Sequence, residues 1–132
     1  MPAPIRDPVI RTTPRPSDIN LNGHIFGGWI LSQMDIAGGI AAIRETGGGA
    51  VATVAIEAMT FHRPVLLTDW VSVYADVVGT GRTSITVHIE VAAMRRGADA
   101  EVMVTEGTFV YVHIDSNGKP LPLTSNRPET HG

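Results

Sequence analysis

A single aspartate interrupts a long apolar stretch in the first third of this sequence. The stretch covers residues 26–46, and Asp35 is its only charged residue before Arg44. A carboxylate among apolar side chains is costly unless it meets water or a hydrogen-bond donor. One interpretation is a functional carboxylate of the kind that acid–base chemistry requires. The other is a structural hydrogen bond at a helix edge that faces solvent or a second subunit.

A cluster of turn-forming residues precedes this stretch and offers a second kind of chemistry. The run Asn20-Leu21-Asn22-Gly23-His24 leads into Gly27-Gly28. Asparagine and glycine before a helix are ordinary capping and turn residues. The functional alternative is that unpaired N–H groups in the first helical turn polarise a substrate carbonyl, which the glycines allow to come close.

Other reactive groups are absent or isolated in the sequence. The chain has no cysteine, which excludes disulfides, thiolate metal sites and a cysteine nucleophile. No pair of histidines has a metal-ligand spacing with a third ligand nearby, so we expect no metal site. His88 and His113 fall on polar faces of predicted strands, and we expect them at the surface. No G-x-S-x-G motif marks a serine nucleophile, and the glycine-rich turn at residues 79–84 lacks the lysine of a phosphate-binding loop.

The apolar stretch itself has the pattern of a helix that Gly47-Gly48-Gly49 ends. Because it is apolar on all sides, we expect it to be a buried, central helix. At helical spacing, one small and polar stripe runs along it, formed by Gly28, Ser32, Asp35 and Gly39. This stripe is where the helix would face a cleft.

The remainder of the chain is rich in β-branched residues with strand periodicity. We expect a short strand near residues 9–13, a strand buried on both faces at 50–58, and alternating strands at 69–78, 83–93 and 101–114. In the last strand Gly107 suggests a bulge or a close approach. One face of that strand is expected to carry Val102, Val104, Val110, Val112 and Ile114. Short turns predict antiparallel neighbours, so the expected fold is α+β, a curved antiparallel sheet wrapped around one long helix.

Length and charge narrow the classes of function. The 132 residues predict a single domain over 1–132, with an arm at 1–8 and a tail at 119–132 outside its compact part. The formal net charge of -3 argues against a general nucleic-acid binder. No apolar run suits a signal peptide or a membrane span, so we expect a cytoplasmic protein.

Several motifs together resemble one protein family. Residues 17–29 (SDINLNGHIFGGW), followed by Gln33-Met34-Asp35, are similar to the hotdog-fold acyl-CoA thioesterases of the YciA type. Further similar segments are VAIEAMTF at 54–61, Pro64-Val65 and GRTSI at 81–85. The resemblance covers roughly residues 10 to 120. Its first motif is specific, whereas the Gly-Arg-Thr-Ser turn alone would not be.

This resemblance implies a hotdog fold and the hydrolysis of acyl-CoA to a free acid and coenzyme A. It implies no cofactor beyond the coenzyme A of the substrate, and dimers with shared active sites, often assembled as a trimer of dimers. The catalytic positions of the family fall on Asp35 and Asn20, contributed by opposite subunits, and on Gly27 and Gly28 as oxyanion donors. The substrate-binding positions implied are Gly81, Arg82, Thr83, Ser84, Met59, Phe61 and Arg63.

The implied mechanism leaves two routes open, because Asp35 either deprotonates a water or attacks the thioester directly to give an anhydride. Coenzyme A is anionic, so an acidic protein needs local cations to bind it, and Arg82 is the first candidate before Arg63, Arg95 and Arg96. Two other functions compete with hydrolysis. One is a non-catalytic module that binds or senses acyl-CoA, and the other is an enoyl-CoA hydratase or dehydratase that would pair His24 with Asp35.

Overall fold

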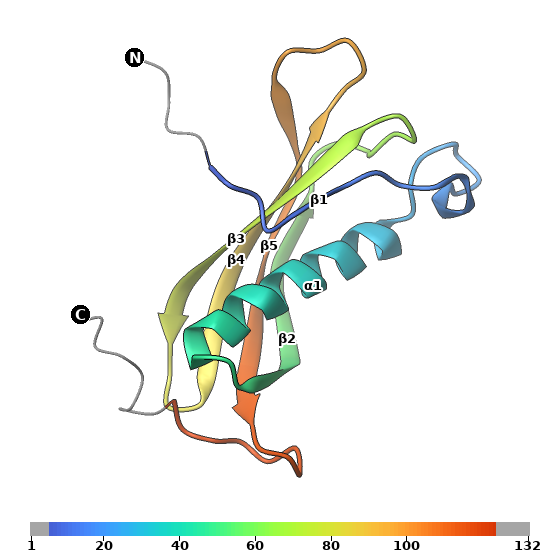
Figure 1. The fold of residues 1–132 in the computed structure, drawn as a ribbon. Coiled ribbons are helices and arrows are strands. Elements are labelled where there is room, and N and C mark those ends of the chain that lie inside the picture. The colour runs from blue at the N-terminus through green and yellow to red at the C-terminus, as the bar shows by residue number, and fades with distance from the viewer. Residues whose placement is uncertain (1–5, 124–132) are drawn as a thin grey trace, which may run out of the picture.

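One long helix, α1 (Gly27–Thr46), lies across one face of a five-stranded antiparallel sheet (Figure 1). A computed structural model describes residues 6–123 of the chain. The strand order is β1-β3-β4-β5-β2, formed by β1 (Ile10–Thr12), β2 (Ala50–Phe61), β3 (Trp70–Thr80), β4 (Ser84–Met94) and β5 (Glu101–Ile114). A short 3-10 turn, η1 (Pro16–Asp18), precedes the helix. The predicted fold class is confirmed.

The ends of the chain were expected to lie outside the compact part. Of the predicted tail, residues up to 123 are described, and Leu121 and Leu123 donate backbone hydrogen bonds to the carbonyls of His113 and Arg82. Residues 1–5 and 124–132, which hold the rest of the expected arm and tail, lie outside the described residues. The division into arm, domain and tail stays a prediction.

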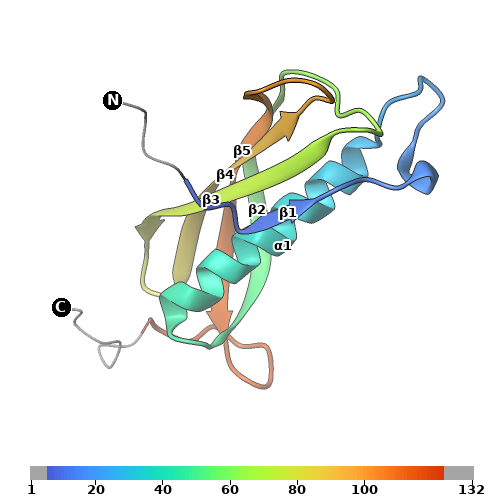
Figure 2. The same ribbon diagram turned by 45° about the horizontal axis from the view of Figure 1, so that its top comes forward.

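Helix α1 buries one face rather than all of its surface. The face toward the sheet carries Ile30, Met34, Ala37 and Ala41, all buried. Ile36 and Ile43 on the other side are 51% and 39% exposed. The expectation of a helix buried all round is wrong for the single chain, because one sheet covers only one face of a helix (Figure 2). The helix ends at Gly47, as expected, in a left-handed conformation.

A bulge in β5 changes which of its side chains face the helix. Val91 on β4 is opposite Thr105, but the next residue, Ala92, is opposite Met103, so Val104 has no partner across the strands. Beyond this extra residue the inward positions are Phe109, Tyr111 and His113, all buried. The predicted apolar face with Val110, Val112 and Ile114 is therefore wrong in this half of the strand, and His113 is not a surface residue.

Gly107 was expected to mark either a bulge or a close approach, and in the structure it marks a close approach. A Cβ atom built on Gly107 would lie 2.6 Å from Sδ of Met59 on β2. The absence of a side chain therefore lets Met59 pack under the sheet beside Met34 of the helix. This contact places one of the predicted substrate-binding residues at the edge of the core.

Strand β2 forms one edge of the sheet and is its most exposed long strand. It pairs with β5 on one side only, and Val54, Ile56 and Phe61 are 57%, 45% and 52% exposed. The expectation of a strand buried on both faces is wrong, because within the chain α1 covers only one face of the sheet and β2 also has no neighbour on its outer edge. A long apolar edge of this kind is a template for pairing with another strand. Among the described residues, no helix is long and apolar enough to cross a membrane.

Candidate active site

Asp35 on α1 is held by two hydroxyl groups from the sheet. Thr53 on β2 donates a hydrogen bond of 2.7 Å to Oδ1 of Asp35. The Tyr111 hydroxyl on β5 lies 3.0 Å from the carbonyl oxygen of Asp35 and 3.1 Å from the same Oδ1. Both donors are neutral, so they fix the position of the carboxylate without cancelling its charge.

The second carboxylate oxygen of Asp35 is left open by this arrangement. Oδ2 accepts no hydrogen bond from any side chain or amide within residues 6–123. Asp35 is partly exposed, so this oxygen is accessible from outside the core. An oriented carboxylate with one free oxygen can remove a proton from water or attack a carbonyl carbon.

Tyr111, the second of these two donors, is buried. It is 1% exposed, and burial, followed by the negative charge and hydrogen bond of Asp35, raises its pKa well above the usual value of 10.0. The phenol therefore remains a neutral donor. Gly38 makes room for it, because a Cβ there would lie 2.3 Å from the Tyr111 hydroxyl.

A separate cavity lies at the N-terminal end of α1. It has a volume of about 270 Å³, and its lining includes Asn20, His24, Gly27, Phe61 and Arg63. Four of the residues predicted as catalytic or substrate-binding are thus brought together, and His24 joins them. Gly28 follows directly and is exposed, in the first turn of the helix.

The start of α1, which borders this cavity at Gly27, has free amide groups. Phe26 is the N-cap and offers no side-chain acceptor. The N–H groups of Gly27 and Gly28 donate to no acceptor in the described part of the chain. Unpaired amides at a helix N-terminus favour negative charge, such as the oxygen of a polarised carbonyl.

Asn20 does not cap the helix, although asparagine before a helix is common. Its Oδ1 accepts hydrogen bonds of 2.9 Å from the amide of Asn22 and 3.1 Å from the amide of His24. These bonds close the loop before the helix and fix which end of the amide is oxygen. Its Nδ2 has no acceptor among the residues described, so a donor remains for a bound molecule.

Asp35 and the cavity belong to different places in one chain. From Gly27 to Asp35 the helix rises about 12 Å, at roughly 1.5 Å per residue. Asp35 does not line the cavity. The single chain therefore keeps the carboxylate apart from the free amides and from Asn20.

The glycine-rich turn between β3 and β4 lies at the other end of the sheet, beside the C-terminal end of α1 (Figure 1). It is closed by a hydrogen bond of 2.9 Å from the Gly81 amide to the Ser84 carbonyl. Arg82 is exposed, whereas Thr83 and Ser84 are half-buried. The structure does not bring this turn near the cavity within one chain.

Arg63 and Arg95, two further candidates for binding an anion, differ in how many of their guanidinium groups' donors are already used within the chain. Arg63 lines the cavity and donates a hydrogen bond of 2.7 Å to the carbonyl of Met103. Arg95 is committed to the buried carboxylate of Asp69 and to the carbonyl of Pro64. Arg95 therefore holds the loop that carries Arg63 and is a weaker candidate for binding an anion.

Sequence reasoning missed Thr53 and Tyr111, the two partners of Asp35. Each lies on a strand far from Asp35 in sequence, so no local motif links them. Tyr111 faces Asp35 only because of the bulge at Val104, which a strict alternation does not predict. A buried tyrosine that needs a partner for its hydroxyl was the one available signal.

Comparison with known proteins places these features in a family. Residues 22–100 match the family model described as Thioesterase superfamily. The chain is 48% identical over 118 residues to the acyl-CoA thioester hydrolase YciA of Salmonella typhimurium, covering 87% of this chain and 88% of that protein.

Solved structures give the same result for the fold. A hexameric hotdog-fold thioesterase of Campylobacter jejuni is 41% identical, with a TM-score of 0.85 over 90% of this chain and 91% of its own. A hexameric thioesterase of Yersinia pestis is 44% identical, with a TM-score of 0.85 over 94% and 100% of the two chains. The sheet wrapped around α1 is the hotdog fold, and this chain belongs to the thioesterase superfamily.

Proposed function

We propose that this protein hydrolyses acyl-CoA thioesters to a carboxylic acid and coenzyme A. The observation that carries the proposal is Asp35, which Thr53 and Tyr111 hold through one oxygen while the other stays open. Relatives named as acyl-CoA thioester hydrolases support the substrate class. Coenzyme A enters as part of the substrate, and the reaction as written needs no resident cofactor or metal.

The active site is proposed to be shared between two subunits. Thr53 and Phe61 are both on the open edge strand β2, where Thr53 binds Asp35 and Phe61 lines the cavity. If β2 pairs with its own copy about a twofold axis near Glu57, Thr53 comes opposite Phe61 of the partner subunit. Asp35 of one chain then lies beside the cavity of the other, and the exposed Val54 and Ile56 lie in the interface.

The chemistry then follows from the groups on each side. The amides of Gly27 and Gly28 polarise the thioester carbonyl, and Nδ2 of Asn20 orients the water or the carbonyl. On one route Oδ2 of Asp35 takes a proton from water as the water oxygen attacks the carbonyl carbon. The C–S bond then breaks, and the proton returns to the departing coenzyme A sulfur. On the other route Asp35 attacks the carbonyl carbon itself, and the C–S bond breaks to release coenzyme A as a thiolate. Water then hydrolyses the resulting anhydride, which frees the acid and Asp35, and a proton from that water goes to the thiolate.

The substrate-binding residues are proposed to act in two groups. Phe61 lines the cavity, and Met59 packs against the core. Both side chains are apolar, so we propose that they contact the acyl chain. Gly81, Arg82, Thr83 and Ser84, with Arg63, suit the phosphates of coenzyme A. The turn that carries Arg82 is remote from the cavity of its own chain, which fits a substrate that spans subunits.

The relatives from Campylobacter jejuni and Yersinia pestis are hexameric, and we extend this to a trimer of dimers here. A cytoplasmic location stays a prediction.

Thiol release from acyl-CoA, followed with a disulfide reagent, tests the function directly. The chain has no cysteine, so the protein contributes no background to this assay. Steady release over a series of acyl chain lengths is the expected result. Tight binding without release would instead support a sensing module. Hydration of an enoyl-CoA would support the hydratase alternative, for which two histidines, His24 and His62, line the cavity beside Asn20 and Gly27.

A further inference from the structure

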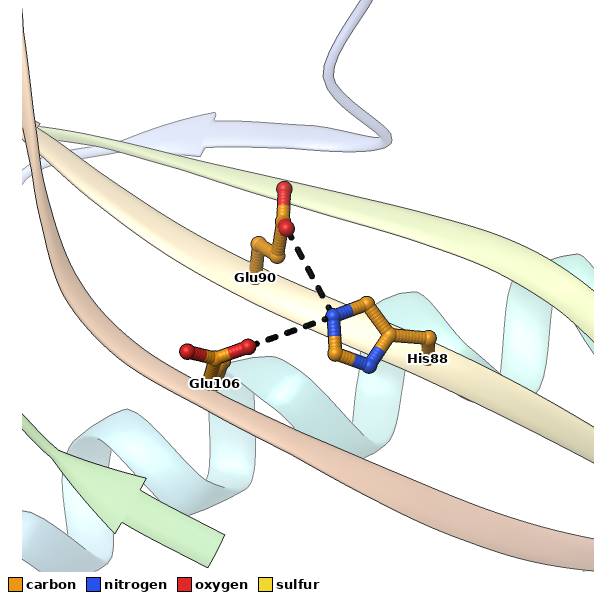
Figure 3. Close-up of side chains that lie close together, drawn as sticks. All are labelled: His88, Glu90 and Glu106. Carbon is orange, nitrogen blue, oxygen red and sulfur yellow. Dashed lines mark ion pairs between the residues drawn. The ribbon is translucent and has the colours of Figure 1, made fainter.

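A second cluster of chemically active side chains lies on the outer face of the sheet, away from α1 (Figure 3). Glu90 on β4 and Glu106 on β5 are directly opposite each other across the two strands. His88 is two residues before Glu90 on β4, so its side chain points to the same face. All three side chains are partly exposed, between 22% and 37%.

The spacing of these atoms differs from that of hydrogen-bond partners. Nε2 of His88 lies 3.5 Å from Oε2 of Glu90 and 3.5 Å from Oε1 of Glu106. Each distance is longer than a normal N–H···O bond of about 2.9 Å. Two ligands of one tetrahedral zinc ion, each about 2.1 Å from the metal, are separated by about 3.4 Å. All three ligand atoms lie within 4.8 Å of one another, so one ion could contact them all.

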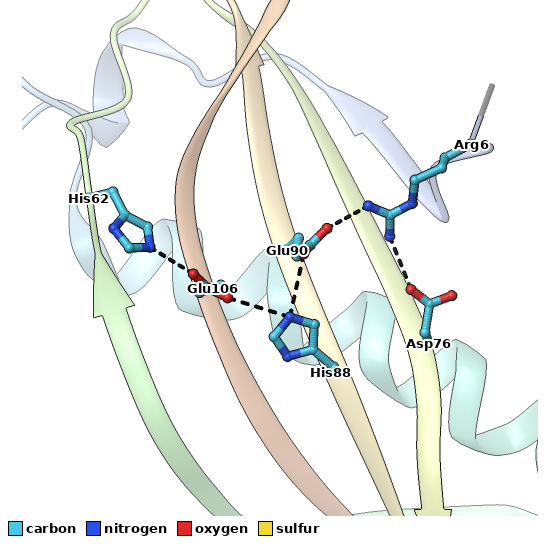
Figure 4. Close-up of polar contacts among 6 residues, drawn as sticks. All are labelled: Arg6, His62, Asp76, His88, Glu90 and Glu106. Carbon is cyan, nitrogen blue, oxygen red and sulfur yellow. Dashed lines mark hydrogen bonds and ion pairs between the residues drawn. The ribbon is translucent and has the colours of Figure 1, made fainter. Parts of the chain in front are cut away.

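The other oxygen of each glutamate is held by a separate partner (Figure 4). Oε1 of Glu90 accepts a hydrogen bond from Arg6, and Arg6 also binds Asp76 at 3.0 Å. Oε2 of Glu106 lies 2.9 Å from Nε2 of His62. Such outer contacts orient ligating carboxylates in metal sites. They leave one oxygen of each glutamate directed toward His88.

The charge of this cluster also favours a cation. With neutral imidazoles, the three carboxylates of Asp76, Glu90 and Glu106 face only the guanidinium of Arg6, which leaves two negative charges. Like charges directly opposite on neighbouring strands are destabilising. A divalent ion between Glu90 and Glu106 would remove this repulsion and neutralise the cluster.

We propose that His88, Glu90 and Glu106 bind one divalent first-row transition metal ion per chain, with zinc as the preferred ion. The imidazole nitrogen favours zinc, cobalt or nickel over magnesium and calcium, which prefer ligand sets made only of oxygen. The ion would tie β4 to β5 on the face opposite the proposed catalytic residues. No step of thioester hydrolysis passes through it.

The test uses the full chain after treatment with a chelator and its removal. Zinc titration followed by calorimetry is expected to show one ion per chain, and Co²⁺ should give the visible absorption of a tetrahedral site. His88→Ala and Glu106→Gln should each weaken zinc binding by at least about tenfold. Zinc should raise the melting temperature of the parent more than that of either variant.

Controls separate this site from unspecific binding. Asp99→Asn removes an exposed carboxylate outside the cluster and should leave zinc binding unchanged. Glu106→Gln keeps the size of the side chain, so it remains informative if His88→Ala folds poorly, and circular dichroism checks both. The proposal is overturned if the parent binds no stoichiometric zinc, if both variants bind it as the parent does, or if Mg²⁺ binds equally well. None of these readouts depends on thioesterase activity.

Discussion

The two faces of the sheet hold carboxylates in different ways. Beside α1, Asp35 is fixed by two neutral hydroxyls, those of Thr53 and Tyr111. On the outer face, Glu90 is bound by the guanidinium of Arg6. Neutral donors orient a carboxylate and preserve its charge for reaction, whereas a cationic partner compensates that charge. The contacts of Asp35 therefore fit its proposed role in catalysis, whereas the pair of Arg6 with Glu90 fits a role in stability.

Removing the reactive charge on the inner face should have the largest effect. Asp35→Asn keeps the size and both hydroxyl neighbours but can act neither as base nor as nucleophile. We expect kcat to fall by about a hundredfold or more, with acyl-CoA binding little changed. Thiol-release kinetics and a separate binding measurement check this. Turnover within a few-fold of the parent would remove Asp35 from the mechanism.

The shared site predicts recovery of activity when two inactive variants are mixed. Asn20→Ala and Asp35→Asn should each be nearly inactive alone. After unfolding and refolding together, about half the dimers should contain one chain of each kind. In such a dimer one site carries both lesions and the other carries neither, so about a quarter of the parental activity should return. If Asn20 and Asp35 acted within one chain, every site would carry a lesion and the mixture would stay inactive, with exchange verified by mass.

The hydroxyl partners of Asp35 should matter less than Asp35 itself. Thr53→Val and Tyr111→Phe each remove one donor while nearly keeping the shape of the side chain. We expect each to lower kcat by about three- to thirtyfold with little change in KM, because only the orientation of the carboxylate is affected. Thr53→Ser keeps the hydroxyl and is the matched control, with near-parental kcat. A rise in KM at constant kcat would instead indicate a role in substrate binding.

These residues also mark how far the sequence predicts the structure. The order of elements, the antiparallel sheet and the long helix follow from local periodicity and from Gly47, and so does the isolated position of Asp35. Tyr111 was missed because the extra residue at Val104 reverses which side chains of β5 face inward. The exposed edge of β2 was missed because its apolar, β-branched pattern is the same as that of a strand buried within its own chain. The pairing of Glu90 with Glu106 depends on register between strands, which no local pattern contains.

Arg82 tests the part of the proposed substrate site that lies outside the cavity. It is exposed in the turn between β3 and β4. Arg82→Ala should raise KM for acyl-CoA a few-fold while kcat changes less, because a phosphate contact acts in binding rather than in the chemical step. It should also weaken the salt dependence of kcat/KM. An unchanged KM at low salt would identify Arg82 as a solvated turn residue.

The smallest expected effect concerns Arg6 and Glu90 on the outer face. The hydrogen bond from Arg6 lowers the pKa of Glu90 below its ordinary 4.5, so this pair stabilises the folded state above that pH. The contribution is lost as the pH falls through the lowered pKa of Glu90. Because both side chains are partly exposed, we expect Arg6→Gln to lower the free energy of unfolding by less than about 1 kcal/mol at pH 7.

The pH dependence of this small effect separates charge pairing from packing. Arg6 also lies over the ring of Tyr74, with its guanidinium carbon 4.4 Å from the ring centre, and this contact does not depend on the charge of Glu90. Urea unfolding at fixed protein concentration should therefore be compared for the parent and Arg6→Gln at pH 7, 5 and 3. If the ion pair dominates, the difference in free energy shrinks as the pH falls, because protonation of Glu90 removes the charge that Arg6 binds. If the difference is the same at all three pH values, Arg6 stabilises the fold through its contact with the Tyr74 ring. The ion pair with Glu90 would then not contribute to stability, and the comparison of the two faces would no longer include it.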